Sequence, residues 1–549
     1  MSLNDQSLID DARRWRDQDP DDTTRAELDG LIAAAEAGRT EPLAERFASR
    51  LEFGTAGLRG ELGAGPARMN RVLVGQAAAG FAAFLLARDP NPSIVIGYDG
   101  RTNSEVFARD TAVIMAGAGV RTTLFPRHLP TPVLAFAVRH LGASAGVMVT
   151  ASHNPARDNG YKVYLGGVDG GSQIVPPADG EIAAQIERVA HDVALGDIPR
   201  STDFATADES IVEAYVTQTA ARAAGGPLSF VYSAMHGVGW ETAQKVFAAA
   251  GFASPALVSE QIEPDAAFPT VAFPNPEEPG AMDLTFAKAA AVGADLAIVN
   301  DPDADRLAVA IPAADGSWRR LSGNEVGFLL GWRVARRSDG VGTLAASLVS
   351  SPALRQVAAQ HHLDFEETLT GFKWISRVDG LVYGYEEALG YLVDPDKVRD
   401  KDGISAAIEF LSLAAELKAA GKSIDDHLDD FAAEFGAYSS GQISLRVDDL
   451  ADIGSMMARL RATPPTAIGS LPVASIDDFA NGFEQFGPND ILRIHLANGA
   501  RVIVRPSGTE PKLKAYLDAS SSVGNPTERR AAAEAVVTQL DAGMRELLG

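Results

Sequence analysis

Two hydrophobic patterns alternate along most of the chain. Short runs of branched residues, such as SIVIGYD (93–99), GVMVT (146–150) and DLAIVN (295–300), are typical of buried strands. Longer stretches rich in alanine and leucine, such as SEVFARDTAVIMAGAG (104–119) and AAIEFLSLAAELKAAG (406–421), indicate helices. This alternation predicts α/β units with largely parallel sheets.

The pattern changes toward the C-terminus. Three segments, SLRVDDL (444–450), DILRIHLANGARVIVRPSG (490–508) and KLKAYLDA (512–519), alternate polar and apolar residues as half-buried antiparallel strands do. The Asn-Gly pair at 498–499 is a strong hairpin signal. An amphipathic helix is expected over 527–548. We therefore expect an α+β domain in this last part.

Polar breaks that contain glycine or proline fall near 196–208, 312–323 and 435–441. At roughly 100–200 residues per domain, a chain of 549 residues is long enough for several domains. A segment rich in Asp, Arg and Ala precedes them and has the composition of helices. We expect a helical extension over 1–50 and four domains over 51–205, 206–320, 321–436 and 437–549.

The composition narrows the possible chemistry. The chain has no cysteine, which excludes disulfides, zinc-thiolate sites, iron–sulfur clusters and thiol nucleophiles. Its 46% hydrophobic and 22% charged residues are ordinary for a globular protein. The 48 basic and 73 acidic side chains give a formal net charge of −25, which argues against nucleic acid or an anionic membrane as a partner.

No membrane-spanning or export segment is expected. The most apolar long stretch, 72–87, is shorter than the ~20 residues of a spanning helix and contains Gln76, so it is expected to be a buried helix. The N-terminus carries Asp5, Asp10 and Asp11 and lacks the basic-then-apolar order of a signal peptide. We therefore expect a cytoplasmic protein.

The first candidate site is TASHNP (150–155), which directly follows a strand-like run. Loops at the carboxyl ends of strands are where α/β proteins place reactive groups, and this loop presents the Ser152 hydroxyl beside His153. Lys162 follows shortly after it. A plainer alternative is a serine that only caps a helix. The adjacent Ser and His do not indicate a hydrolase triad, because sequence neighbours rarely pair as nucleophile and base.

The second candidate site is NDPDADR (300–306), which also follows a strand-like run. Asp301, Asp303 and Asp305 can converge on one hard cation, and oxygen ligands suit Mg²⁺. Three like charges this close repel one another in the absence of a cation. An aspartyl nucleophile of the haloacid-dehalogenase type also begins with D-x-D after a strand and is an open alternative, although Asp305 stands where that type carries Thr or Val.

The third candidate site is RPSGTEPKLK (505–514). Arg505, Ser507 and Thr509, with the backbone N–H groups around Gly508, are suited to surround the oxygens of a phosphate. The lysines that follow add positive charge, although a β-turn with incidental charges also accounts for them.

Two weaker segments carry further polar residues. FGTAGLRG (53–60) is a glycine-punctuated turn with one arginine, Arg59, and lacks the spacing of a P-loop. YGYEEALGY (383–391) sets Glu386 and Glu387 among aromatic residues and glycines, which suits the binding of sugar hydroxyls. On its own, this acidic pair would more often be a solvated helix start.

Together these segments resemble the α-D-phosphohexomutase superfamily over nearly the whole chain. TASHNP is similar to its phosphoserine loop, DPDADR to its magnesium loop, GYEEALG to its sugar-binding loop and RPSGTEPK to its phosphate-binding loop. FGTAGLRG, GFKW (371–374) and RDKDG (399–403) add to the match. The resemblance implies an α/β protein with four domains, three of them α/β with mixed sheets and the last α+β, around a central cleft. The forms that three of these motifs take here, ASHNP, DPDADR and EEA, look closest to the branch that contains bacterial phosphoglucomutases and phosphopentomutases.

The resemblance also implies an activity, that of a phosphosugar mutase, which is an intramolecular phosphotransferase. Ser152 would carry a phosphoryl group, and Mg²⁺ would bind Asp301, Asp303, Asp305 and that phosphate. A sugar 1,6-bisphosphate would be the intermediate and activator. The other implied site residues are Lys162, Arg59 and His153 for proton transfer and charge stabilisation, Arg306 for bracing the metal loop, Glu386, Ala388 and Lys373 for the sugar, Arg505, Ser507, Gly508 and Thr509 for the phosphate, and Lys401 and Lys512 as further candidates. A lysine that acts as a base needs a depressed pKa, which nearby Mg²⁺ and arginine could supply.

Glucose 1-phosphate and glucose 6-phosphate are the expected substrates. Many hexomutases carry Glu-x-Ser where this chain has Glu386-Glu387-Ala388, so mannose and pentose phosphates are open alternatives, because contacts worth ~1–3 kcal/mol decide such choices. A phosphatase that uses Asp301 as nucleophile is a more remote alternative, and a non-catalytic sugar-phosphate sensor would require a broken nucleophile or metal loop. The expected partner is a small phosphosugar, without nucleic acid or membrane, and the protein is expected to be a monomer or homodimer.

Overall fold

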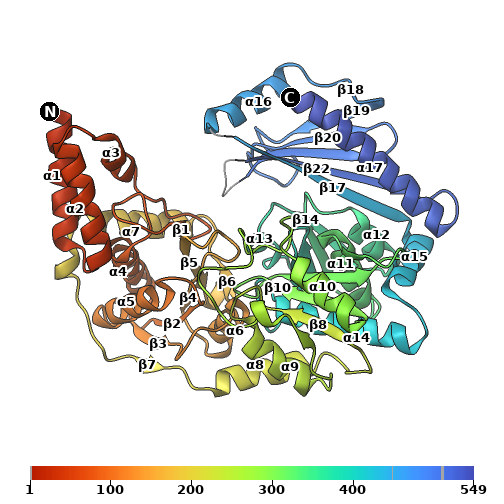
Figure 1. Cartoon of the computed structure of the whole chain (residues 1–549), viewed down its shortest axis with the longest axis horizontal. Coiled ribbons are helices and arrows are strands. Elements are labelled where there is room, and N and C mark those ends of the chain that lie inside the picture. The colour runs from red at the N-terminus through yellow and green to blue at the C-terminus, as the bar shows by residue number, and fades with distance from the viewer. Residues whose placement is uncertain (1–2, 448, 508–511) are drawn as a thin grey trace. The chain divides into compact units, whose positions relative to one another are not determined.

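The computed structural model describes residues 3–447, 449–507 and 512–549, and Figure 1 labels many of its helices and strands. The chain forms two compact units, and each is described by itself. Unit 1 comprises Met1–Arg320, Phe372–Arg377 and Gly390–Ala415, and unit 2 comprises Leu321–Gly371, Val378–Leu389 and Glu416–Gly549. The chain thus leaves unit 1 after Arg320 and returns to it twice.

The N-terminal part of unit 1 is helical. Its helices are α1 (Leu3–Gln18), α2 (Asp22–Glu36) and α3 (Glu41–Phe47). Their apolar faces meet in a core that contains Ile9, Leu28 and Leu43. The Asp21 side chain begins α2 by accepting a 2.8 Å hydrogen bond from the Thr23 backbone N–H.

The first sheet of unit 1 is mixed, with the strand order β1-β5-β4-β2-β3-β7 and with β6 paired to β5. β2 runs parallel to β3 and β4, and β3 runs parallel to β7. β5 runs antiparallel to its neighbours β4, β1 and β6. The strands are β1 (Leu58–Glu61), β2 (Ser93–Tyr98), β3 (Arg121–Leu124), β4 (Ala145–Val149), β5 (Asp158–Leu165), β6 (Ser172–Gln173) and β7 (Ala205–Thr206). The helices between them are α4 (Arg71–Arg88), α5 (Ser104–Gly117), α6 (Thr131–His140), α7 (Ala178–Asp192), η1 (Gly167–Asp169) and η2 (Leu195–Asp197).

Helix α4 is the apolar stretch expected to be a buried helix. It begins after Asn70, whose side chain accepts a 3.0 Å hydrogen bond from Leu73 N, and it packs against α5 and α7. Leu73, Ala77 and Phe81 are almost completely buried in the core of the first sheet. Within the described residues α4 is the one helix that is long and apolar enough to cross a membrane, and 67% of it is buried inside the structure, as in the core helix of a soluble protein.

The second sheet of unit 1 is also mixed and has the strand order β12-β11-β10-β8-β9. β8 runs parallel to β10 and β9, whereas β11 runs antiparallel to β10 and β12. The strands are β8 (Phe230–Ser233), β9 (Ala256–Leu257), β10 (Leu296–Asn300), β11 (Leu307–Pro312) and β12 (Trp318–Arg320). The helices are α8 (Ser210–Ala220), α9 (Gly239–Ala249), α10 (Asp283–Val292) and η3 (Ser259–Gln261).

The first sheet of unit 2 contains three parallel strands, with β13 between β14 and β15. The elements of this part of unit 2 are α11 (Gly323–Ala335), β13 (Thr343–Ser347), α12 (Ala353–Gln360), β14 (Asp364–Thr368), β15 (Leu381–Glu386) and α15 (Ile424–Phe435). The segments that return to unit 1 hold α13 (Phe372–Ile375), β16 (Gly390–Leu392) and most of α14 (Gly403–Ala419).

The C-terminal sheet of unit 2 is antiparallel throughout, with the strand order β17-β22-β21-β20-β19-β18. Its strands are β17 (Ala437–Arg446), β18 (Ala467–Ile468), β19 (Leu471–Asp478), β20 (Leu492–Leu496), β21 (Arg501–Pro506) and β22 (Lys512–Ser521). The helices are α16 (Leu450–Ala462) and α17 (Pro526–Leu548), and Figure 1 shows α17 lying along β17 and β22. The Asn-Gly pair lies in the turn of the β20–β21 hairpin, as expected. The α+β character of this part is confirmed.

One expected strand, 444–450, is wrong in its second half. β17 ends at Arg446, and α16 begins at Leu450. The Asp449 side chain accepts a 2.9 Å hydrogen bond from Ala451 N and so caps the new helix. A short acidic residue is a strong helix start, and it overrides the alternating pattern here.

Candidate active site

Ser152 lies at the carboxyl end of β4, in the loop that leads to β5. Its backbone is left-handed, with φ = 51°, and the residue is 2% exposed. The hydroxyl donates a 2.9 Å hydrogen bond to Asp301 Oδ2 and lies 3.1 Å from His153 Nδ1. The strand β5 follows the loop, so Ser152 does not cap a helix, and the plainer alternative for this serine is excluded.

The metal-loop candidates lie in the tight turn that joins β10 to β11. Asp301, Asp303 and Asp305 are fully buried, and one carboxylate oxygen from each lies within 4.8 Å of the others. The turn is closed by Ala304 in a left-handed conformation, with φ = 55°. Arg306 N donates a 2.9 Å hydrogen bond to Asp301 Oδ1, and Arg306 Nε lies 3.8 Å from Asp305 Oδ1.

These three carboxylates fit a hard divalent cation. The Oδ1 atoms of Asp303 and Asp305 are buried and have no hydrogen-bond partner among the described residues. Burying an unpartnered anionic oxygen is costly, and cation ligation offsets that cost. Because carboxylate oxygens are the ligands that Mg²⁺ prefers, the aspartate triad could hold this metal.

Two lysines of unit 1 lie against the aspartate triad. Lys162 Nζ on β5 donates to Asp303 Oδ2 at 2.7 Å and to Asp305 Oδ2 at 2.9 Å. Lys401 Nζ lies 3.2 Å from Asp305 Oδ2 and 3.1 Å from Asp400 Oδ1. The structure therefore brings Lys401, a further candidate from the sequence, into the same cluster as Lys162.

The electrostatics of the cluster follow from burial and from close charges. Burial, the charges of Asp303 and Asp305 and their mutual repulsion raise the pKa of Asp301 well above its ordinary value of 3.8. Burial lowers the pKa of Lys162, but Asp303 and Asp305 outweigh it, so that the pKa lies above the ordinary value of 10.5. A lysine that acts as a base would need a depressed pKa, which is the direction considered for Lys162 in the sequence. The structure instead raises the pKa of Lys162.

His153 and Arg59 flank the Ser152 loop. Burial, and then the positive charges of Arg306 and Arg59, hold the pKa of His153 well below its ordinary value of 6.5, so its imidazole is neutral at pH 7. Arg59 on β1 donates to Asn154 Oδ1 at 3.2 Å. Burial lowers the pKa of Arg59 from its ordinary value of 12.5, although a guanidinium keeps its charge at neutral pH.

Sequence reasoning missed two polar residues of this cluster. Thr131, at the start of α6, donates from Oγ1 to Asp303 Oδ2 at 2.7 Å and from its backbone N–H to the Asp303 carbonyl at 2.9 Å. Arg101 donates to the carbonyls of Ser152 and Asn154 at 2.7 and 2.6 Å. Arg101 follows a predicted strand directly, in Asp-Gly-Arg, which is the position that singled out Ser152 and Asp301.

The expected sugar-binding residues divide between the units. Lys373, on α13 in unit 1, donates from Nζ to Thr55 Oγ1 in the FGTAGLRG segment. Glu386, at the end of β15 in unit 2, accepts the Gly371 backbone N–H. The neighbouring carboxylate of Glu387 is engaged by two serine hydroxyls of unit 2, each at 3.1 Å. Ala388 follows in the same loop and is partly exposed.

The expected phosphate-binding residues lie at the end of β21 in unit 2. Arg505 Nη1 donates to Thr370 Oγ1 at 2.7 Å, next to the Gly371 N–H that Glu386 accepts. Unit 2 thus brings Arg505 and Glu386 to the same turn. Ser507 N donates to the Lys512 carbonyl at 2.7 Å, at the start of β22. Gly508 and Thr509 lie outside the described residues.

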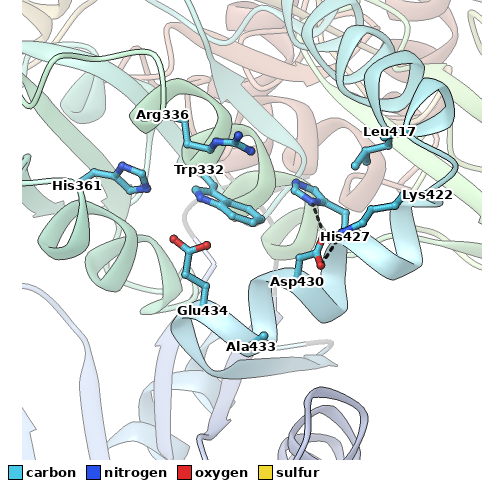
Figure 2. A pocket seen from close by; sticks show the side chains of 10 residues that line it. Trp332, Arg336, His361, Leu417, Lys422, His427, Asp430, Ala433 and Glu434 are labelled. Atoms are coloured by element: carbon cyan, nitrogen blue, oxygen red, sulfur yellow. Dashed lines mark hydrogen bonds and ion pairs between the residues drawn. The ribbon is translucent and has the colours of Figure 1, made fainter.

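A separate cavity in unit 2 has a volume of about 720 Å³ (Figure 2). Its lining includes Trp332 on α11, His361 after α12, and His427 and Asp430 on α15. The Trp332 and His427 rings stack at 4.5 Å, and Asp430 accepts from Lys422 Nζ at 2.7 Å. None of the expected site residues lines this cavity, so its size does not mark it as the site of the chemistry.

Comparison with known proteins identifies four consecutive family domains. The chain matches the models of phosphoglucomutase/phosphomannomutase alpha/beta/alpha domain I over 50–192, domain II over 209–314, domain III over 322–435 and the C-terminal domain over 443–533. The four matches together cover most of the chain.

Three relatives carry different substrate names. A probable phosphomannomutase of Haemophilus influenzae is 56% identical over 87% of this chain and 98% of its own. The phosphopentomutase of Homo sapiens is 35% identical over 95% of this chain and 93% of its own. A phosphoglucomutase of Staphylococcus epidermidis is 34% identical over 88% of this chain and 93% of its own.

The fold is shared with solved structures. A phosphoglucomutase/phosphomannomutase family protein from Burkholderia thailandensis superposes with a TM-score of 0.69 at 20% identity, over 91% of this chain and 97% of its own. This likeness agrees with the mixed α/β sheets and the antiparallel last sheet described above. The chain therefore belongs to the phosphoglucomutase/phosphomannomutase family, within the α-D-phosphohexomutase superfamily, and is a phosphomutase.

Proposed function

We propose that this phosphomutase interconverts the 1-phosphate and 6-phosphate of a hexose, with glucose as the principal substrate, through a phosphoserine at Ser152. The observation that carries the proposal is the 2.9 Å hydrogen bond from Ser152 Oγ to Asp301 Oδ2. It sets a hydroxyl at the edge of a carboxylate triad suited to a divalent cation, which is the arrangement that phosphoryl transfer needs.

The proposed reaction has two transfers. In the first, the P–O bond to Ser152 Oγ breaks as a P–O bond to the free sugar hydroxyl forms. The hydroxyl proton leaves the sugar oxygen and Ser152 Oγ takes up a proton, which yields a sugar 1,6-bisphosphate. In the second, Ser152 Oγ gives up its proton as the other phosphoryl group passes to it from the sugar, and the sugar oxygen that is left takes up a proton. No phosphate is lost, so the bisphosphate serves as intermediate and activator.

The neighbouring side chains have proposed roles that follow from their charges. His153, neutral at pH 7, can accept a proton beside the transferring group, 3.1 Å from Ser152 Oγ. Lys162, in its ammonium form, stabilises the negative charge that spreads over the phosphoryl oxygens. When bound by Asp301, Asp303 and Asp305, Mg²⁺ supplies further positive charge at the same oxygens.

In unit 2, Glu386 and Arg505 are proposed to bind the rest of the substrate. A carboxylate accepts hydrogen bonds from sugar hydroxyls, and a guanidinium donates to the oxygens of the phosphate that is not transferred. Their common contact with the turn at 370–371 gives these two groups a fixed relation within unit 2.

A phosphatase that uses Asp301 as nucleophile is less well supported. Both carboxylate oxygens of Asp301 already accept hydrogen bonds, one from Ser152 Oγ and one from Arg306 N, and the side chain is fully buried. A nucleophilic oxygen must direct a lone pair at phosphorus, and these hydrogen bonds compete for the lone pairs of Asp301, whereas the Ser152 hydroxyl is a donor toward the triad.

Ser152→Ala tests the proposal. The variant is expected to lose conversion of glucose 1-phosphate to glucose 6-phosphate and to take up no label from ³²P-bisphosphate, while circular dichroism stays unchanged. Ser144→Ala is the matched control, because Ser144 directly precedes the same strand, β4, and its hydroxyl accepts from Ser93 N. Full activity of Ser152→Ala, or label on an aspartate instead of this serine, would refute the proposed mechanism.

A substrate panel tests the sugar. The kcat/KM for glucose, mannose and ribose 1-phosphates is compared in the presence of the matching bisphosphate. We expect the highest value for glucose, since the variants of the phosphoserine, metal and sugar loops together resemble a branch that includes bacterial phosphoglucomutases. A higher value for mannose or ribose would overturn glucose as principal substrate while leaving the phosphoserine mechanism intact.

A further inference from the structure

The guanidinium of Arg101 gathers four backbone carbonyls of the Ser152 loop. Nη2 donates to the carbonyls of Ser152 at 2.7 Å and Asn154 at 2.6 Å. Nη1 donates to the carbonyls of Pro155 at 2.8 Å and Asp158 at 3.1 Å. A single side chain therefore holds the loop from its nucleophile-bearing residue to the start of β5.

Arg101 is itself held in place from several sides. Its side chain is 1% exposed, its Nε lies 3.5 Å from Asp99 Oδ2, and its backbone N–H donates to Asp99 Oδ1 at 3.0 Å. Ser104 Oγ donates to the same Asp99 Oδ1 at 2.6 Å. Phe268, from the second sheet's part of unit 1, covers the guanidinium with its ring centroid 4.9 Å from Cζ.

The Ser152 backbone requires such support. A left-handed conformation is unfavourable for a residue other than glycine, because Cβ crowds the following carbonyl. At φ = 51° the Ser152 carbonyl points to Arg101 and the hydroxyl reaches Asp301. Without the four donors, the loop would relax to a conformation in which the hydroxyl is aimed elsewhere.

We infer that Arg101 is a positioning residue of the phosphomutase reaction: it stabilises the left-handed conformation of Ser152 that directs Oγ toward Asp301. Arg101 itself does not contact the Oγ atom, and it acts through the loop backbone. The reaction step that it serves rests on the proposed function, whereas its hold on the loop is a property of the fold.

Lysine cannot replace this arginine. A guanidinium presents five N–H donors in a rigid planar fork, and four of them are used here by carbonyls on two sides of the fork. An ammonium offers its three donors at one point and cannot span those carbonyls. Arg101→Lys keeps the charge and most of the volume and removes the geometry, so it isolates positioning from electrostatics.

The test compares Arg101→Lys with Arg71→Lys. Arg71 likewise donates from two guanidinium nitrogens, in this case to the carboxylate of Asp110 at 2.7 and 2.8 Å. It lies outside the Ser152 loop. Arg101→Lys is expected to keep its circular dichroism, to lose about 100-fold in kcat with KM changed less than about threefold, and to speed amide hydrogen exchange in 150–157 by about 10-fold or more. Arg71→Lys is expected to lower thermal stability with kcat and loop exchange unchanged.

The outcomes separate this inference from the proposed function. Wild-type kcat in Arg101→Lys, or a fall in kcat with unchanged loop exchange, would overturn the positioning role. Label on an aspartate in the wild type would refute the phosphoserine mechanism, and the exchange measurement would still decide whether Arg101 holds the loop. Where Arg101→Lys does not fold, Asp99→Asn carries the same test, because it leaves the arginine in place and removes the carboxylate 3.5 Å from its Nε.

Discussion

Ser152 Oγ and Asp301 Oδ2 are joined by a 2.9 Å hydrogen bond, although 149 positions separate them in the chain. Each residue stands at the carboxyl end of a strand, β4 in the first sheet and β10 in the second. Because both sheets belong to unit 1, this contact fixes a hydroxyl against a carboxylate triad within one compact unit.

Removal of the metal should stop turnover without unfolding the protein, and loss of one metal ligand should raise the Mg²⁺ requirement. We expect a chelator to stop the reaction and added Mg²⁺ to restore it. Asp303→Asn is expected to raise the Mg²⁺ concentration for half-maximal activity by about 100-fold or more, since even a residue one contact removed from a metal is worth about 10- to 100-fold in affinity. Activity measured against free Mg²⁺ checks this.

The control for the metal prediction is Asp110→Asn, which weakens the partly buried ion pair with Arg71 in the same unit. It should lower stability and leave the Mg²⁺ requirement unchanged. An unaltered requirement in Asp303→Asn would contradict the assignment of the triad as the metal site.

Gly237→Ala should displace the metal loop through a clash with the Pro302 backbone. A Cβ at Gly237 would lie 2.2 Å from Pro302 Cα and 2.3 Å from the Pro302 carbonyl oxygen, and Val238 N donates to that carbonyl at 2.9 Å. Because backbone is the neighbour, the loop must move, at a cost of about 1–3 kcal/mol in the free energy of unfolding. Urea denaturation and a Mg²⁺ titration measure the two effects.

Gly180→Ala serves as the comparison for the glycine prediction. Gly180 lies in α7, and a Cβ there meets nothing within 4 Å. Alanine should be neutral or should stabilise this helix by up to about 1 kcal/mol, with no change in the Mg²⁺ requirement. Equal behaviour of the two alanine variants would show that the Gly237 contact does not support the metal loop.

The ion pairs of Arg127 should make the free energy of unfolding of unit 1 fall at low pH. Its guanidinium binds Glu241 at 2.9 and 2.6 Å and Glu209 at 2.8 and 3.0 Å. The hydrogen bonds from Arg127 lower the pKa of Glu241 from 4.5 to about 2. A depressed carboxyl pKa adds stability above pH 4.5, and this stability is lost as the pH falls from 4.5 through 2.

Arg127→Met should therefore cost about 1 kcal/mol at pH 7, after discounting for the solvent screening of these partly exposed side chains. The difference from the wild type should shrink as the pH falls toward 2. Arg109→Met is the matched control, because its pair with Glu105 is exposed and 3.8 Å long and should contribute little. Chemical denaturation at several pH values distinguishes them, and a constant difference down to acid pH would contradict the linkage.

His427 should give unit 2 a second, milder pH dependence. Burial against the Trp332 ring lowers the pKa of His427 from 6.5, although Asp430, 3.6 Å away, opposes this shift (Figure 2). A depressed histidine pKa adds stability above pH 6.5 and loses it as the pH falls below that value. His427→Phe retains a stacked ring without a titrating group, so its melting temperature should fall less than that of the wild type between pH 7.5 and 5.5. A parallel fall in both proteins would contradict this.

The loops that carry chemistry could be predicted because each follows a recognisable strand. Ser152 and Asp301 stand directly after buried runs, and Arg505 lies in a strand of the expected hairpin. A polar cluster at a strand end is costly unless it has a function, so the local pattern is informative without knowledge of the fold. The roles of these residues in the reaction stay predictions until the variants above are measured.

The supporting contacts could not be predicted because they join distant segments. Thr131 meets Asp303 across 172 positions, and Lys162 meets it across 141. No periodicity encodes such pairs, since they depend on how the first and second sheets of unit 1 pack together. Arg101 could have been predicted from the sequence, since its Asp-Gly-Arg segment follows a strand just as TASHNP does. The helix that starts at Leu450 was within reach as well, from its capping aspartate.

The third family domain, matched over 322–435, is not one body in space. Its segments Phe372–Arg377 and Gly390–Ala415 belong to unit 1, where Arg377 binds Asp169 at 2.6 Å and Lys401 lies 3.2 Å from Asp305. A chimera that exchanges the whole third domain between two relatives would therefore replace side chains that pack within unit 1 by side chains that fit the unit 1 of another protein. The stretch Val378–Leu389, which carries Glu386, is the piece that recombination can exchange without breaking those contacts.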